Sequence, residues 1–164
     1  MADGVEDLEY WVTVMRLQEE GAEVVSVGSD TKPHTGKNGV PVQADVLSTD
    51  LSADDIDGVV IPGGWAPDKM RRDANLVALV RDADAKGLPI GIICHGGSVA
   101  ITAGIVNGKR VTGSLGIKDD LVNAGGTWVD EPAFRDGNQV WGRVVADIPA
   151  FTRELIALCV EAAG

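Results

Sequence analysis

The stretch GLPIGIICHGGSVA, residues 87–100, decides the fold. Its apolar run from Pro89 to Ile93 is typical of a buried strand, and the residues from Ser98 to Ala103 have the character of a helix. A Cys-His-Gly triplet at 94–96 stands at the junction. A strand that passes directly into a helix presents such a junction above the carboxyl end of the sheet, where open α/β folds place their sites.

The same alternation of strand and helix runs along the whole chain. It predicts one domain, 1–164, with a mostly parallel sheet covered by helices on both faces. Strands are expected at 23–27, 58–61, 110–112, 127–129 and 139–141, with 40–46 as an edge strand or hairpin arm, and helices from near Gly4 to Gly21 and at 68–86, 117–123 and 148–162. Because the chain opens on a helix, the first strand of a doubly wound sheet is missing. We expect that this strand is absent or that the natural chain starts upstream of Met1.

Composition excludes several classes of function. The 164 residues are 45% hydrophobic and carry a net charge of −11, which argues against binding to nucleic acid or anionic membranes. No stretch is long and apolar enough for a membrane span, and the acidic start is not a secretory signal. Two distant cysteines, Cys94 and Cys159, are expected as free thiols in a cytoplasmic protein. No zinc motif, dinucleotide fingerprint or phosphate loop is present, so no metal or cofactor is predicted.

The first helix has an amphipathic pattern. Asp3 and Glu6 have the spacing of a capping box, and an apolar stripe is expected to face the core, formed by Leu8, Trp11, Val12 and Met15. Glu6 and Asp7 are interpreted as a solvated face. For Glu9, composition leaves open whether it shares that face or has a functional role.

The chemistry centres on Cys94. Its place between strand and helix matches a nucleophile elbow, and the positive end of the helix is expected to favour the thiolate. His95 can act as general base and supply a backbone N–H to an oxyanion hole. Gly63 and Gly64, which end the preceding strand, are expected to supply further oxyanion donors. Cys159 is interpreted as a core residue, and His34, in a polar loop, as surface.

Five segments of the chain resemble one family. They are VEDLE (5–9) with RLQEEG (16–21), VVIPGGWAPD (59–68), ICHGGSVAITAG (93–104), GKRVTGSLGIKDDLVNAGGTWVDE (108–131) and DGNQVWGRVVADIPAF (136–151). Together they are similar to the PfpI-type intracellular cysteine proteases of the ThiJ/PfpI superfamily. The resemblance covers almost the whole chain in order. It implies a flavodoxin-like three-layer sandwich in the class I glutamine-amidotransferase-like group.

The resemblance also implies roles for single residues. Cys94 would be the nucleophile beside His95, and Glu9 would be a buried, protonated carboxyl hydrogen-bonded to the sulfur. Asp68 would complete a triad across a subunit interface, in a homo-oligomer (dimer or hexamer). This chain departs from the family pattern in carrying Asp at 68, where Glu is usual, and Ser114-Leu115 in place of Tyr-Pro. A third departure is Thr13, where the family has Pro.

Three kinds of function remain open. The first is a cysteine enzyme that acts on reactive aldehydes or glycated groups, like glyoxalase III or a deglycase, because an aldehyde needs only a thiolate, a proton shuttle and a small pocket. The second is an intracellular cysteine peptidase with a peptide substrate. The third is a non-enzymatic redox sensor or stress protein that oxidises at Cys94. A glutamine amidotransferase is set aside, because the late part of the chain has no histidine.

Overall fold

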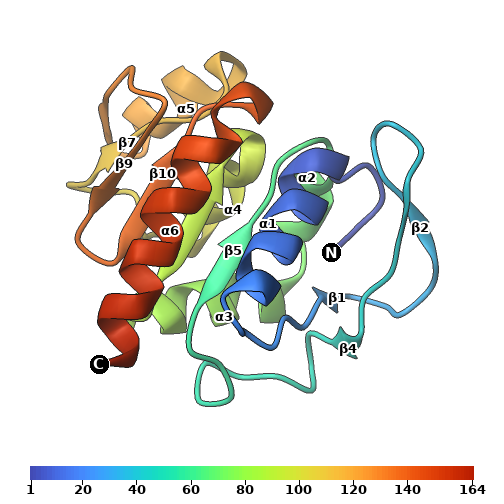
Figure 1. Ribbon diagram of the computed structural model, residues 1–164. Helices are drawn as coiled ribbons and strands as arrows, with labels where there is room; N and C mark the ends of the chain where they lie inside the picture. The colour runs from blue at the N-terminus through green and yellow to red at the C-terminus, as the bar shows by residue number, and fades with distance from the viewer.

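A four-stranded sheet forms the centre of the molecule, which a computed structural model describes from Met1 to Gly164 (Figure 1). The strand order is β5 (Val59–Ile61), β6 (Ile90–Ile93), β10 (Gln139–Gly142), β9 (Ala133–Asp136). β5, β6 and β10 are parallel, and only β9 is antiparallel to its neighbour. The predicted α/β fold with a mostly parallel sheet is confirmed.

Helices cover both faces of this sheet. α1 (Asp7–Glu19) and α6 (Ile148–Ala163) lie side by side on one face, in blue and red in Figure 1. The other face carries the remaining helices, α2 (Ala66–Met70), α3 (Ala74–Ala85), α4 (Gly97–Ala103) and α5 (Lys118–Asn123). The result is a three-layer sandwich, as expected when a parallel sheet has both faces buried.

Strand β6 shows why the layers pack as they do. All four of its residues are buried, and alternate ones face opposite layers. Ile90 and Ile92 join the larger core cluster, and Ile93 joins the cluster under α6. Gly91 also faces α6, where an added Cβ would lie 3.0 Å from the Phe151 ring, so a small residue lets the helix approach closely.

Three two-stranded pairs surround the central sheet. β1 (Val27–Gly28) and β4 (Val46–Leu47) are parallel, and so are β7 (Arg110–Val111) and β8 (Thr127–Trp128). β2 (His34–Thr35) and β3 (Pro41–Val42) form an antiparallel hairpin, so the 40–46 segment supplies both a hairpin arm and part of β4. No strand precedes α1, and the β1–β4 pair is not hydrogen-bonded to the central sheet.

Two element predictions had wrong bounds, and one strand was missed. The strand expected at 23–27 begins only at Val27, and the helix expected at 68–86 is two helices. They are separated because the Asp73 carboxylate caps α3, accepting hydrogen bonds from the N–H groups of Asn75 (2.8 Å) and Leu76 (3.3 Å). β9 was missed, although the Gly137-Asn138 turn that joins it to β10 is a hairpin signal.

The orientation predicted for α1 was right for Trp11 and Val12, which pack against the core, and wrong for the other two residues of the stripe. Leu8 and Met15, expected to face the core, are 51% and 60% exposed. The buried face carries Asp7, Glu9 and Thr13 instead, and Glu6 just before the helix is buried too. No side chain caps the helix, so the expected capping box is not formed. The hydrophobic periodicity placed these apolar residues in the core, because it carries no information about the hydrogen-bond partners of the acidic residues elsewhere in the chain.

Those partners lie in the loop between β2 and β3. The Asp7 carboxylate accepts hydrogen bonds from the backbone N–H groups of Asn38 (2.7 Å) and Val40 (2.8 Å) and from the Asn38 side-chain amide. Burial tends to raise the pKa of Asp7, but these hydrogen bonds to the carboxylate outweigh it and lower the pKa. Asp7 is thus a buried anchor for this loop, not part of a solvated face.

No helix of the structure has the length and apolar character that crossing a membrane requires.

Replacing Asp7 should therefore destabilise the fold. Asp7→Ala leaves the Asn38 and Val40 N–H groups without their acceptor, and we expect a loss of about 2–4 kcal/mol in the free energy of unfolding, measured by urea denaturation. Asp57→Ala, at an exposed position, is the matched control and should change it by less than about 0.5 kcal/mol. Equal small effects in both variants would contradict the anchoring role.

Candidate active site at the β6–α4 junction

Cys94 lies at a sharp backbone turn directly after β6. It is the only residue other than glycine with a positive φ, at 58°. An L-residue in this left-handed region carries a strain of about 1–2 kcal/mol, which the surrounding structure must hold. Gly96 makes the turn possible, because a Cβ there would lie 2.3 Å from the Ile61 carbonyl oxygen. The strand-to-helix elbow expected from the sequence is present.

Glu9 reaches this turn from α1. Its side chain is fully buried, and Oε2 accepts a hydrogen bond from the Gly63 N–H at 2.7 Å. The other oxygen, Oε1, accepts no hydrogen bond. A Cβ on Gly63 would lie 2.7 Å from both the Cys94 Cβ and Glu9 Oε2. The glycine therefore lets the carboxyl of α1 and the thiol of the elbow come together.

The carboxyl and the thiol compete for one negative charge. Burial raises the pKa of Glu9 to about 7, although the hydrogen bond from Gly63 opposes this. Burial also raises the pKa of the Cys94 thiol, and an ionised Glu9 raises it further. From the sequence we expected the helix terminus to lower the pKa of the thiol. Burial and the charge of Glu9 act in the opposite direction, and they outweigh this effect. Two adjacent anions are unfavourable, so the thiolate is favoured when Glu9 holds the proton.

Two backbone N–H groups face the Cys94 sulfur. They belong to His95 and Gly64, and both favour the thiolate by hydrogen bonding to it. Gly64 has φ +78°, and a Cβ there would collide with the Gly4 carbonyl oxygen. Gly63, expected as a third donor, differs from the prediction because its N–H is already bound to Glu9. The donors that converge on the sulfur are therefore those of Gly64 and His95.

The His95 ring lies beside the thiol. Its Nδ1 is 3.4 Å from the Cys94 sulfur, although adjacent side chains often diverge. Burial, and then the positive charge of Lys37, lower the pKa of His95. A neutral imidazole at this distance can exchange a proton with the sulfur or with a group bound to it.

Asp68 is not part of this cluster. It lies in the first turn of α2, its side chain is 68% exposed, and it forms an ion pair with Arg72 in the turn after this helix. No hydrogen bond or ion pair connects it to His95 within the chain.

Sequence reasoning missed Lys37 and Glu6. Lys37 forms an ion pair with Glu6 (Nζ to Oε2, 3.1 Å), and its charge acts on Cys94, Glu9 and His95. Glu6 was interpreted as solvated, yet it is 4% exposed. The available signal was the turn-rich excursion at 29–41, because long loops in compact domains are often functional.

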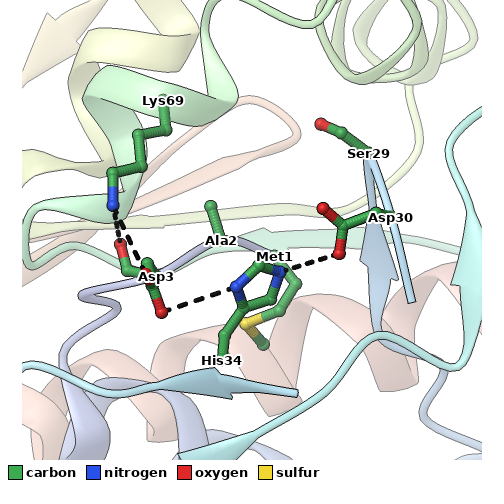
Figure 2. Close-up of a pocket in the computed structure, with 7 residues that line it drawn as sticks. All are labelled: Met1, Ala2, Asp3, Ser29, Asp30, His34 and Lys69. Atoms are coloured by element: carbon green, nitrogen blue, oxygen red, sulfur yellow. Dashed lines mark hydrogen bonds and ion pairs between the residues drawn. The ribbon is translucent and has the colours of Figure 1, made fainter. Parts of the chain in front are cut away.

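A polar pocket of about 240 Å³ is lined by residues that do not belong to the cluster around the thiol (Figure 2). His34, expected at the surface, lies half-buried between two carboxylates, with Nδ1 3.4 Å from Asp3 and Nε2 3.1 Å from Asp30. Lys69 contacts the other side of Asp3. These contacts tie the β1–β2 loop to the N-terminal segment. No group of three or more His, Cys, Asp and Glu side chains is arranged to hold a metal ion.

Comparison with known proteins decides the family. The family model described as DJ-1/PfpI matches residues 1–158. The chain belongs to the DJ-1/PfpI family. Among its curated relatives in this family, a protein of Pyrococcus abyssi named a deglycase is 40% identical over 157 residues, which cover 96% of this chain and 95% of that protein. A Bacillus subtilis member, provisionally named a cysteine protease, is 35% identical over 159 residues, covering 96% of this chain and 94% of that protein.

A solved DJ-1/PfpI structure has nearly the same fold. It is a two-domain protein of Anabaena variabilis with DJ-1/ThiJ/PfpI-like and ferritin-like domains, and it matches with a TM-score of 0.94 and 38% identity. The match covers 96% of this chain and 46% of that protein, so this chain spans about half its length. The resemblance deduced from the five sequence segments is confirmed at the level of the family.

The raised pKa of Glu9 predicts a pH-dependent stability. In the unfolded chain Glu9 has its ordinary pKa of 4.5, and in the folded chain about 7. A raised folded-state pKa contributes stability that is fully present below pH 4.5 and is lost as the pH rises through about 7. The free energy of unfolding of the wild type, relative to Glu9→Gln, should fall by about 3 kcal/mol across this window.

Urea denaturation at a series of pH values measures this difference. Glu9→Gln is the matched variant, because its amide oxygen can still accept the Gly63 hydrogen bond. A difference between the two proteins that does not change with pH would show that Glu9 titrates normally in the folded chain.

Proposed function

We propose that this protein is a cysteine-dependent enzyme that acts on reactive aldehydes or glycated groups through the Cys94 thiolate. The observation that carries the proposal is the convergence of four groups on one strained residue: the Glu9 carboxyl, the His95 ring and the N–H groups of Gly64 and His95. A deglycase name among close relatives agrees with this chemistry.

The geometry suggests how an aldehyde would react. The sulfur adds to the carbonyl carbon and forms a C–S bond, while the carbonyl electron pair moves to oxygen. The N–H groups of Gly64 and His95, which face the sulfur, stabilise that developing charge. Protonated Glu9 supplies the proton that neutralises the oxygen, and this is consistent with its raised pKa.

For a 2-oxoaldehyde the same groups complete the reaction. Neutral His95 removes the proton from the carbon bound to sulfur, and the electron pair moves onto the neighbouring carbonyl oxygen, which takes up a proton to give an enediol. The proton then returns to the neighbouring carbon while the hydroxyl on the carbon bound to sulfur loses its proton, which leaves a thioester. Water then cleaves the C–S bond and releases a 2-hydroxy acid. The net reaction of methylglyoxal adds one water and forms lactate, and it needs no external oxidant or reductant.

A peptidase is the second candidate, because the Bacillus relative carries the provisional name of a cysteine protease. Peptide cleavage also needs an acid for the leaving amine. The neutral His95 ring must then become protonated against its lowered pKa. For this reason we favour aldehyde and glycated substrates.

A free, reactive thiol further suggests a reducing compartment such as the cytoplasm.

Substitution of the nucleophile tests the proposal. Cys94→Ala should reduce lactate formation from methylglyoxal by at least about three orders of magnitude. Cys159→Ala is the matched control, since that thiol lies on α6 and packs against its apolar cluster, and it should retain activity. Casein cleavage tests the peptidase alternative. Oxidation of Cys94 by mild peroxide, detected by mass spectrometry, tests the redox-sensor alternative. Turnover of methylglyoxal that survives Cys94→Ala would refute the proposal.

We further propose that the enzyme is a homo-oligomer in which Asp68 approaches His95 of a second copy. Asp68 is exposed at the start of a helix, and it would exchange its ion pair with Arg72 for a contact with the second copy. Asp68→Asn should then lower kcat at least about tenfold with unchanged folding. Asp82→Asn, an exposed helical Asp beside Arg81, is the matched control. A monomer in light scattering, or full activity in Asp68→Asn, would contradict this role.

A further inference from the structure

The loop that carries Lys37 is held unusually firmly beside the active site. The Lys37 N–H donates to the Val5 carbonyl at 2.8 Å, and the N–H groups of the flanking residues Asn38 and Val40 donate to Asp7. These are backbone contacts, so the position of the Lys37 main chain does not depend on its own side chain. Val5 and Asp7 both adjoin the turn that leads into α1, the helix that supplies Glu9.

The Lys37 ammonium has one partner within the chain, the Glu6 carboxylate. It lies 3.1 Å from Glu6 Oε2, while the other Glu6 oxygen accepts from the Asn38 amide at 3.0 Å. The Glu6 side chain is 5% exposed, but that of Lys37 is 40% exposed. An ammonium has three N–H donors, and Glu6 occupies one side of it. Glu6 therefore orients a cation that stays partly open to solvent.

The charge of this cation reaches the nucleophile. The Glu6 N–H donates to the Gly63 carbonyl at 3.1 Å, and Gly63 packs directly against the Cys94 side chain. Within the chain, the charge of Lys37 acts on Cys94, Glu9 and His95. A protein with net charge −11 repels small anions over most of its surface, so an oriented cation whose charge acts on the thiol is a local exception.

We propose that Lys37 binds a carboxylate of the substrate, so that this site favours carbonyl compounds with an anionic group beside the reacting carbon, such as aldehydic acids and 2-oxo acids. The inference deepens the function proposed above and rests on it for the carbonyl chemistry. The sulfur adds to the carbonyl carbon, the carbonyl oxygen takes a proton, and the carboxylate remains unchanged, paired with Lys37. The alternative is that Lys37 only neutralises buried Glu6.

Alkylation of Cys94 separates these possibilities without requiring turnover. Iodoacetate and iodoacetamide both form an S–C bond to the thiolate and release iodide, but only iodoacetate carries a carboxylate. The ratio of their rate constants at Cys94, followed by peptide mass spectrometry, reports carboxylate binding. Lys37→Met should lower this ratio about tenfold, the size expected for loss of one charge-assisted hydrogen bond at a half-exposed site.

Two further variants complete the experiment. Lys37→Arg keeps the charge and should restore most of the ratio, and it tests the proposal even if Lys37→Met folds poorly. Lys32→Met removes an exposed cation from the same excursion and should leave the ratio unchanged. If Lys37→Met slows both reagents equally, Lys37 acts only on the thiolate or on Glu6, and the proposal is overturned.

A binding measurement then addresses the substrate class. Glyoxylate should inhibit methylglyoxal turnover competitively, and Lys37→Met should raise its inhibition constant about tenfold while the KM of methylglyoxal changes little. Equal effects on the two compounds would also overturn the proposal. If methylglyoxal is not turned over at all, the proposed function fails, whereas the alkylation ratio still decides the role of Lys37.

Discussion

The hydrogen bond between the Gly63 N–H and the buried Glu9 carboxyl holds the site together. It joins two elements 54 residues apart in sequence, at 2.7 Å and out of contact with solvent. Because a buried carboxyl without a partner is costly, this contact fixes how α1 lies against the end of β5. The same carboxyl lies against Cys94, so the orientation of one helix determines the electrostatic environment of the thiol.

That constraint explains why the first turn of α1 is acidic and buried. Glu6, Asp7 and Glu9 point inward. Glu6 and Asp7 both bind the β2–β3 loop and share the Asn38 amide, whereas Glu9 binds Gly63. The apolar side chains of Leu8 and Met15 are turned outward as a consequence. A helix normally buries its apolar stripe, and here hydrogen bonding to buried carboxyls outweighs that preference.

The elbow depends on close backbone approach as well as on charge. Cys94 is held at a positive φ because β6, the turn and α4 follow one another without a loop, and the glycines around it remove every Cβ that would obstruct this path. Gly63 and Gly96 each sit where a methyl group would overlap a neighbouring atom. The strain at the nucleophile is thus maintained by packing on three sides, from β5, α1 and α4.

The amino-acid sequence by itself determined the local features of this protein. A short apolar strand followed directly by Cys-His-Gly, paired glycines after another strand, and alternating strand and helix patterns each follow from near-neighbour sterics and periodicity. They were sufficient to predict the α/β sandwich and the elbow at Cys94, and the resemblance of five sequence segments indicated the family.

Only the tertiary structure decided which acids are buried and what they hold. Whether Glu6 and Asp7 face solvent depends on a loop some 30 residues away, and the use of the Gly63 N–H depends on Glu9. Lys37 likewise joins the site through contacts distant in sequence. Such pairings carry no local periodicity, because a carboxylate stabilised by long-range hydrogen bonds looks the same in sequence as one that water solvates.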